Sequence, residues 1–351
     1  MRITDVEVHR YTIPAATPFD WRDGLPGSEP AQTAAWLRIT TDEGIDGIAW
    51  TLRGVIVADI VERRLRHELI GADPLRREWL WHRVWEIDRI EEMPIYALGL
   101  VDIALWDIAA KQARLPLHQF LGGYRDSLPA YASTVTYGSI EQYLDIADQC
   151  RELGYPAIKL HAWGDAKRDS ALITALRDHV GDDYALMYDG SAGFDLPDAV
   201  YVGHALADAG YLWYEEPMRE FNVTAHRWLA DQVRVPLLVA ETSDGAHMNT
   251  ADFITTGCAQ YVRTDAMMKG GITGALRIAH LADAFRLRAE VHGGGLAHAH
   301  LCLAIPNTTY YESLIPDVPV VREPLVGADG HVRVSDAVGI GWEEGAELPW
   351  A

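Results

Sequence analysis

The sequence predicts an α/β protein of two parts, an α+β domain followed by a barrel of parallel strands that alternate with helices. The length of 351 residues exceeds the usual size of one domain and leaves room for a barrel of about 200 to 250 residues. Strand patterns precede helical patterns before residue 122, whereas strands and helices alternate after residue 128. Three of the later apolar runs end in an acid, at Asp189, Glu215 and Glu241.

The first part begins with strand patterns. Residues 2–13 alternate apolar and polar side chains, as a half-buried strand does. Runs 34–40 and 45–50 are joined by Thr41-Asp42-Glu43-Gly44, which is typical of a hairpin turn. Helical periodicity follows over 58–70, 75–88 and 94–113. We therefore expect an α+β domain over residues 1–125.

A long connection, residues 14–31, separates the first two strands. It is rich in Pro and Gly, shows no periodicity and contains Trp21. Loops of this length often close over a ligand as a lid, although a solvated loop fits these residues equally well.

The second part, residues 126–322, alternates strand and helix. Helical stretches such as 140–153, 170–179 and 273–285 separate the strand runs. Eight parallel strands separated by helices predict a barrel whose chemistry lies at the C-terminal strand ends. Residues 323–351 are expected to pack back on the first domain. The strands are centred on Tyr131, Lys159, Met187, Trp213, Val239, Arg263, Val291 and Tyr310.

Composition excludes some partners. The net charge of −21 argues against nucleic acid and against an anionic membrane surface, because both attract basic proteins. It does not exclude an anionic small molecule, since a bound cation and one lysine would set the local field. Cys150, Cys258 and Cys302 lack metal or redox spacing, so we expect reduced thiols. Without a recognisable signal peptide or long apolar run, the expected location is the cytoplasm.

The acids Asp189, Glu215 and Glu241 are spaced 26 residues apart, close to the length of one strand and helix unit. Each acid would end a consecutive strand, so the three side chains would converge. Oxygen ligands without Cys or His suit a hard cation, Mg²⁺ before Zn²⁺. The alternative is that each acid only caps the following helix, but three acids in equal register favour a metal site.

Other strand ends carry ionisable groups in the same register. Alternation sends Lys159 and His161 to the same side of the second barrel strand. The sixth, seventh and eighth strands end at Asp265, His292 and Glu312. A carboxylate cage flanked by lysine and histidine suits removal of a weakly acidic proton next to a carboxylate, because cation and ammonium stabilise the enediolate that forms.

The side chains at the ends of the sixth, seventh and eighth strands each have an expected role in the proton transfer. His292 can act as base or acid near neutral pH. Asp265 could hold its other ring nitrogen and fix the tautomer. Glu312, with a pKa raised by burial, could donate a hydrogen bond to the enediolate oxygen. His298 and His300 are interpreted as structural residues.

These residues resemble the mandelate racemase subgroup of the enolase superfamily, and the similarity covers the whole chain. The resemblance implies a (β/α)7β modified TIM barrel with an N-terminal α+β capping domain. It implies one Mg²⁺ held by Asp189, Glu215 and Glu241, an acid/base dyad formed by Asp265, within the run 263–271, and His292 on the seventh strand, and Glu312 on the eighth strand. Members of this family commonly assemble as dimers to octamers, so a homo-oligomer is expected.

Two positions leave alternatives. Glu215 and Glu216 are adjacent and point to opposite sides, and both the spacing and the family pattern favour Glu215 as the ligand. The family's usual Lys-x-Lys on the second strand is here Lys159-x-His161, which removes the second lysine base. His161 could act opposite His292 or only contact a substrate hydroxyl.

The resemblance implies dehydration of an acid sugar, an aldonate or aldarate, to a 2-keto-3-deoxy acid. The alternatives are racemisation or epimerisation of a hydroxy or sugar acid, cycloisomerisation of a lactone, and binding of a sugar acid without turnover. A hydrolase fits least, because no His-rich cage or second metal set is present. Trp21, Trp163 and Ser191 are the candidate substrate contacts.

Overall fold

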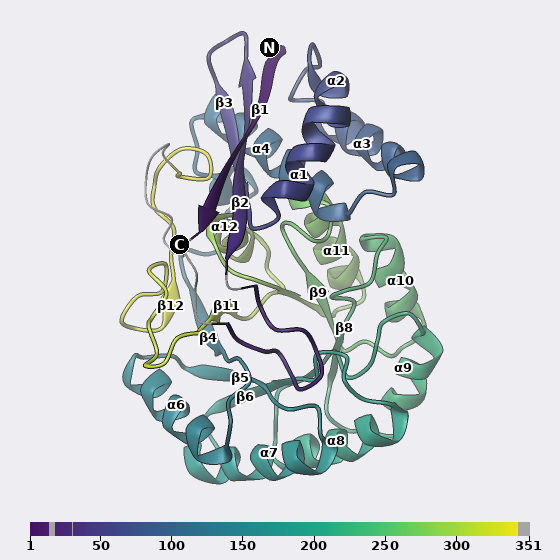
Figure 1. The fold of residues 1–351 in the computed structure, drawn as a ribbon, viewed down its shortest axis with the longest axis vertical. Coiled ribbons are helices and arrows are strands. Elements are labelled where there is room, and N and C mark those ends of the chain that lie inside the picture. Colours follow the sequence, from purple (N-terminus) through teal and green to yellow (C-terminus); the bar gives the residue numbers. More distant parts are fainter. Residues whose placement is uncertain (14–17, 30, 343–351) are drawn as a thin grey trace.

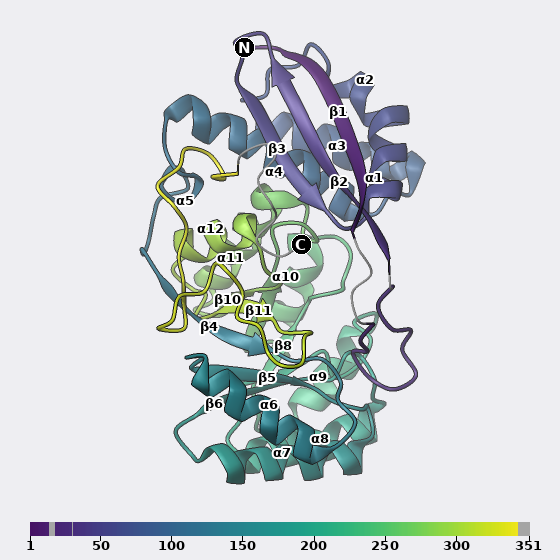
Figure 2. The same cartoon turned by 60° about the vertical axis from the view of Figure 1, so that its left-hand side comes forward.

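A computed structural model describes residues 1–13, 18–29 and 31–342 of the chain. The first domain is an antiparallel sheet in the order β1-β2-β3, backed by helices (Figures 1 and 2). The predicted hairpin is confirmed, with Gly44 in its turn at a φ of 75°. The elements are β1 (Ile3–Ile13), β2 (Gln32–Thr41), β3 (Asp46–Thr51), α1 (Gly54–Ile60), the π-helical turn η1 (Val61–Leu65), α2 (Arg66–Leu69), α3 (Arg77–Glu91), α4 (Ile95–Ala113) and α5 (Leu117–Phe120).

The second domain confirms the predicted barrel, with eight parallel strands and a helix in each of the seven connections. Its strands are β4 (Leu128–Ser133), β5 (Ala157–His161), β6 (Ala185–Asp189), β7 (Tyr214–Glu215), β8 (Leu237–Val239), β9 (Tyr261–Thr264), β10 (Arg288–Val291) and β11 (Tyr311–Leu314). Its helices are α6 (Ile140–Glu152), α7 (Ala166–Val180), α8 (Leu196–Asp208), α9 (Val223–Ala230), α10 (His247–Thr255), α11 (Gly271–Ala284) and α12 (Leu296–Ala304).

The strands follow the order β10-β9-β8-β7-β6-β5-β4-β11, so neighbours in the sequence are neighbours in the sheet except where β11 pairs with β4. The helices lie outside this curled sheet (Figure 1). Helix α7 begins before the predicted residue 170, because the Asp165 carboxylate accepts hydrogen bonds from the amides of Lys167 and Arg168. Five side chains, one from each of β4 to β6, β8 and the segment before β7, pack inside the barrel: Tyr131, Ala157, Met187, Trp213 and Leu238.

The helix α4 joins the two domains. It is apolar on nearly all faces, because one side packs on the sheet and another on α11. Gly99 of α4 lies against the Met267 carbonyl so closely that a Cβ atom would come within 2.1 Å of the oxygen. Asp102 of α4 accepts hydrogen bonds from the amide and hydroxyl of Thr273 at 2.8 and 2.7 Å. The loop between β9 and α11 is therefore held directly by the first domain.

The tail contacts both domains. The strand β12 (His331–Val332) pairs antiparallel with β4 of the barrel. Farther on, the Leu117 amide donates to the Gly339 carbonyl at 2.7 Å, and the Ile340 amide donates to Asp107 at 2.8 Å. The domain boundaries at residues 125 and 322 stay predictions. Within the described residues, no helix is long and apolar enough to cross a bilayer.

Candidate active site

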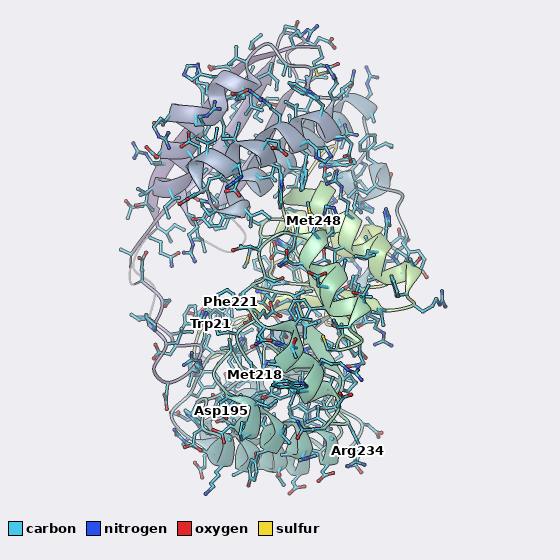
Figure 3. The ribbon with its side chains drawn as sticks, turned by 90° about the vertical axis from the view of Figure 1, so that its right-hand side faces the viewer. Trp21, Asp195, Met218, Phe221, Arg234 and Met248 are labelled. Atoms are coloured by element: carbon cyan, nitrogen blue, oxygen red, sulfur yellow. The ribbon has the colours of Figure 1, made fainter. Side chains whose placement is uncertain are left out.

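One cavity of about 280 Å³ lies at the C-terminal ends of the barrel strands. The residues around it come from β5, β6, β11 and the loops that follow β6, β7, β8 and β10. The loop 18–29 descends from the first domain onto this mouth, and Trp21 lies on it (Figure 3). The residues predicted from the sequence that line the cavity are Trp21, Lys159, His161, Asp189, Ser191, Glu241, His292 and Glu312.

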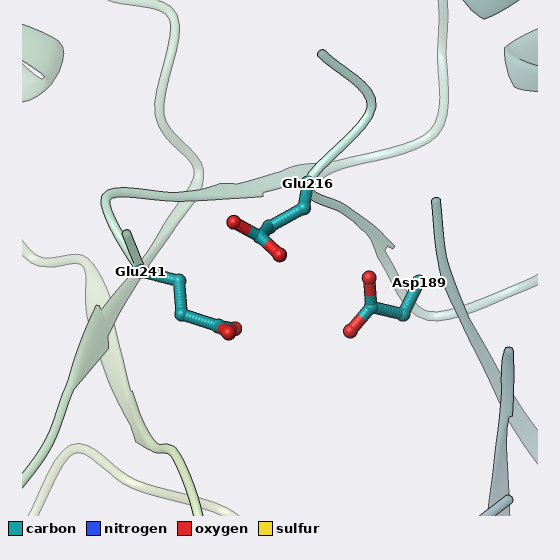
Figure 4. A group of neighbouring side chains, drawn as sticks. All are labelled: Asp189, Glu216 and Glu241. Carbon is teal, nitrogen blue, oxygen red and sulfur yellow. The ribbon is translucent and has the colours of Figure 1, made fainter. Parts of the chain in front are cut away.

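Three carboxylates converge in the cavity, those of Asp189, Glu216 and Glu241 (Figure 4). One oxygen of each lies within 4.8 Å of the others. The predicted set contained Glu215 in place of Glu216, but in the structure it is the Glu216 carboxylate that lies with those of Asp189 and Glu241. Asp189 and Glu241 lie where they were predicted.

The physical reason lies at the end of β7. Glu215 is the last strand residue, and its carboxylate points into the barrel, where Arg263 pairs with it and Lys159 donates at 3.0 Å. Glu216 has a φ of 38°, so the backbone leaves the extended conformation there. Strand alternation no longer applies, and the Glu216 side chain turns into the cavity. The Thr242 hydroxyl donates to it at 2.8 Å.

The three carboxylates fit a cation. Burial, with Asp189 and Glu220 nearby, raises the pKa of Glu216 well above its usual value. Burial and the Glu216 charge also raise the pKa of Glu241 well above its usual value. The Glu241 Oε2 atom is buried and accepts no hydrogen bond from the described residues. Repelling carboxylates, with a buried oxygen that accepts no hydrogen bond, suit a hard divalent ion with oxygen ligands, such as Mg²⁺.

Lys159 pairs with Asp189 and with two further carboxylates, those of Glu215 and Glu312. Its Nζ atom is 3.2 Å from Asp189, 3.0 Å from Glu215 and 2.9 Å from Glu312. Burial lowers its pKa, but Glu215 and Glu312 outweigh burial and raise it well above the usual value. Lys159 therefore stays an ammonium that stabilises negative charge, and it is a poor base.

His161 faces Asp189. Its Nε2 atom is 3.1 Å from Asp189 Oδ2, and its Nδ1 atom is 2.7 Å from the Thr134 carbonyl oxygen. Because a carbonyl can only accept, Nδ1 carries a proton and Nε2 is the nitrogen that faces the cavity. The Trp21 ring packs against the imidazole with centroids 4.6 Å apart.

His292 and Asp265 are brought together as predicted. The His292 Nδ1 atom is 2.7 Å from Asp265 Oδ2, and its Nε2 atom is 3.3 Å from Glu241 Oε1. Burial lowers the pKa of His292, but the nearby carboxylates of Glu241 and Asp265 outweigh burial and raise the pKa to about 9. The amides of Met267 and Met268 hydrogen-bond to Asp265 Oδ1 and fix its carboxylate.

Glu312 corrects a prediction. A raised pKa and a protonated carboxyl were expected. Burial does raise the pKa, but Lys159 and Arg263 outweigh burial and hold it well below the usual value. Glu312 Oε1 is 2.9 Å from Lys159 Nζ, and Oε2 accepts from the Gly293 amide at 2.8 Å. Glu312 is therefore an ionised acceptor that anchors Lys159 and the loop after His292.

The candidate substrate contacts separate into two groups. Ser191 lines the cavity, and its hydroxyl donates to the Trp21 carbonyl at 3.4 Å, while Arg22 Nε donates to the Ser191 carbonyl at 3.0 Å. The loop 18–29 thus docks on the mouth, whereas residues 14–17 and 30 of the predicted lid lie outside the described residues.

Trp163, the third predicted substrate contact, does not line the cavity. Its side chain packs edge-on against Tyr143, and its indole N–H donates to the Tyr137 carbonyl at 2.6 Å. It supports the lid instead, because its own carbonyl accepts from the Asp23 amide at 3.1 Å.

Sequence reasoning missed three residues. Arg263 lies two residues before Asp265, so strand alternation was a signal that it points inward, where it pairs with Glu215. Glu220 accepts hydrogen bonds from the amides of Ala240, Thr242 and Ser243, which flank Glu241, and no sequence pattern announces it. His298, interpreted as structural, lies 3.4 Å from Asp265.

Comparison with known proteins gives matches along nearly the whole chain. The family described as mandelate racemase / muconate lactonizing enzyme, N-terminal domain, matches residues 22–122, and the family described as enolase C-terminal domain-like matches residues 142–346. The chain is 27% identical to L-talarate/galactarate dehydratase of Salmonella typhimurium, covering 97% of this chain and 88% of that one.

Two further relatives differ in their named reactions. The chain is 29% identical to 3,6-anhydro-α-L-galactonate cycloisomerase of Streptomyces coelicolor, covering 97% of this chain and 96% of the other. The crystal structure of D-glucarate dehydratase from Agrobacterium tumefaciens complexed with magnesium superposes with a TM-score of 0.90 at 30% identity, covering 97% and 96% of the two chains.

Proposed function

The chain belongs to the enolase superfamily, in its mandelate racemase and muconate lactonizing enzyme group, and on that premise we propose that it removes the proton α to a carboxylate and dehydrates an acid sugar. The product would be a 2-keto-3-deoxy acid. One observation carries the proposal: the His292 and Asp265 dyad faces a carboxylate triad and an ammonium across one cavity.

One Mg²⁺ would be held by Asp189, Glu216 and Glu241. Their carboxylates converge, and the buried Oε2 atom of Glu241 accepts no hydrogen bond from the described residues. The chemistry that Mg²⁺ supplies when bound is electrostatic stabilisation of negative charge on the substrate carboxylate. Glu215 is the competing ligand, favoured by the equal spacing along the chain. Variants of each glutamate separate the two assignments and are described in the Discussion.

The protein's own groups account for the proton transfers. His292 would present Nε2 to the substrate, because Asp265 holds the proton on Nδ1. His292 Nε2, or His161 from the other face, would take the α-proton, and the Lys159 ammonium would stabilise the negative charge that develops on the carboxylate oxygens. A protonated His292 or His161 could then donate to the departing β-hydroxyl.

A second candidate keeps the first step and changes the second, giving a racemase, an epimerase or a cycloisomerase. The observation that favours it is His161, whose Nε2 faces the cavity from β5 while His292 enters from the loop after β10. Two imidazoles on separate strands suit removal of a proton on one face of a carbon and return on the other.

The test is proton NMR of the protein with Mg²⁺ in D₂O against acid sugars, including galactarate, glucarate, galactonate and their lactones. Exchange of the α-proton together with a 2-keto-3-deoxy product is the expected result. Exchange or isomerisation without loss of water would move the assignment to the second candidate. No exchange with any acid would contradict both and favour a binding protein.

A further inference from the structure

Asp265 has a second imidazole partner besides His292. His298 Nε2 lies 3.4 Å from Asp265 Oδ1, while His292 Nδ1 lies 2.7 Å from Oδ2. The carboxylate therefore lies between two histidine rings, with one ring on each oxygen. Since a carboxylate only accepts, both of these ring nitrogens are donors.

The backbone between the two histidines creates this arrangement. His292 follows β10, and His298 is in the first turn of α12. Gly293 between them has a φ of 76°, which glycine adopts without strain, and a Cβ atom there would lie 3.6 Å from His298 Nε2 and 3.8 Å from Asp265 Oδ2. The Gly295 amide donates to the Tyr311 hydroxyl at 2.7 Å and fixes the start of α12.

The contact with Asp265 identifies the ring nitrogen of His298 that donates. Because the Asp265 carboxylate can only accept, the Nε2 atom of His298 carries a proton. With the amides of Met267 and Met268 also on Oδ1, four donors surround the carboxylate.

His298 approaches Asp265 from a different side than the substrate would. It does not line the cavity of the carboxylate triad. It lines a neighbouring cavity of about 380 Å³ between the first domain and the barrel, where most lining side chains are apolar. Asp265 and His292 line this second cavity too, so the dyad forms part of the wall between the two spaces.

We propose that His298 is a positioning residue for the dyad. By donating Nε2–H to Oδ1, it holds the Asp265 carboxylate so that Oδ2 receives the His292 proton and His292 Nε2 faces the α-carbon. No bond to His298 forms or breaks in the reaction. The proposal rests on the proposed function, and it assigns a role to a residue that the strand-end pattern does not contain.

The test compares His298→Leu, which removes the donor, with His298→Gln, whose amide can still donate to Asp265. His300→Gln is the matched control, because His300 lies on the same helix and contacts His118 and Ile340 but not Asp265. With an acid sugar that the wild type turns over, we expect His298→Leu to lower kcat by about 10- to 100-fold, the range seen for outer partners of functional histidines. KM and Mg²⁺ affinity should stay within about 2-fold.

His298→Gln should recover most of the lost kcat, and His300→Gln should keep the wild-type value. Wild-type kcat in His298→Leu, or an equal loss in His300→Gln, would overturn the proposal. A loss in His298→Leu that appears only in KM would also overturn it.

A second measurement keeps the inference separate from the proposed function. In protein labelled with ¹⁵N-histidine, long-range proton–nitrogen spectra report which ring nitrogen carries the proton. We expect His298 protonated on Nε2 in the wild type and a changed tautomer balance in Asp265→Asn. If the wild type turns over no acid sugar, the proposed function fails while this result still decides the His298 contact. A proton on Nδ1 of His298 with none on Nε2 would refute the contact.

Discussion

Glu215 and Glu216 are neighbours in the chain, but their carboxylates lie in different surroundings. Glu215 is paired with Arg263 and Lys159 inside the barrel, whereas Glu216 joins Asp189 and Glu241 at its mouth. One acid therefore neutralises buried cations, and the other leaves a negative site for a cation to fill. This difference makes the two residues separable by experiment.

Glu216→Gln should weaken Mg²⁺ binding by about 100-fold or more, because it removes a charged ligand. It should raise the free energy of unfolding of the metal-free protein, since it relieves repulsion among the acids. Glu215→Gln should instead cost about 3 to 5 kcal/mol of stability, because it leaves buried charges underpaired. Titration calorimetry measures the Mg²⁺ affinity of each variant, and urea denaturation measures its free energy of unfolding. Lost Mg²⁺ binding in Glu215→Gln alone, at unchanged stability, would restore the ligand set predicted from the spacing.

Removing the metal should abolish turnover and lower stability. EDTA leaves Asp189, Glu216 and Glu241 uncompensated, and excess Mg²⁺ should restore activity. At a free concentration of 100 times Kd, the ion adds about 2.7 kcal/mol to the free energy of unfolding. Thermal denaturation with EDTA and with Mg²⁺ checks this. Full activity in EDTA would rule out the metal assignment.

His292→Asn should lower dehydration by about 10²- to 10⁴-fold, because it removes the general acid/base group. Exchange of the α-proton should survive if His161 takes that proton from the other side. Product formation and deuterium incorporation are followed in the same NMR samples. Unchanged dehydration would contradict the role of the dyad.

Glu220→Gln should loosen the loop that carries Glu241. The carboxylate accepts from three amides there, and Ala240 within this loop has a φ of 71°, which a non-glycine residue adopts only under restraint. We expect a loss of about 1 to 3 kcal/mol in stability and weaker Mg²⁺ binding. Glu152→Gln on the exposed surface of α6 is the control. Equal behaviour of the two variants would show that Glu220 does not restrain the loop.

Acid should destabilise the protein partly through His300. Burial lowers the pKa of this residue from 6.5 to about 3. Between these values the unfolded chain binds a proton that the folded chain does not, so stability falls as the pH drops below 6.5. Between pH 6.5 and pH 5 the free energy of unfolding should fall by about 2 kcal/mol through this residue. His300→Gln should flatten the stability curve over this window. An equally steep curve would assign the effect to other groups.

Much of the site was predictable because strand alternation holds wherever the backbone is extended. Asp189 ends its strand in that conformation, and Lys159 and His161 follow the same rule along β5. The equal spacing of the acids then placed them on adjacent strands. Fold class and domain order followed from the same periodicity.

The places where the structure departs from the sequence pattern have separate causes. Alternation failed at Glu216, where a left-handed backbone turns the side chain. The ionisation of Glu312 depends on Lys159 and Arg263, which come from other strands and were not paired with it in the sequence. Trp163 follows β5 by two residues, which suggested a place at the mouth of the barrel. Its ring instead packs edge-on against the Tyr143 ring.

The contacts of α4 make the first domain part of the catalytic apparatus. Gly99 presses on Met267, whose amide also holds Asp265, and Asp102 caps α11 just beyond. The barrel and the first domain should consequently unfold as one cooperative unit around this loop. The barrel expressed alone would lack the contacts that support the loop carrying Asp265.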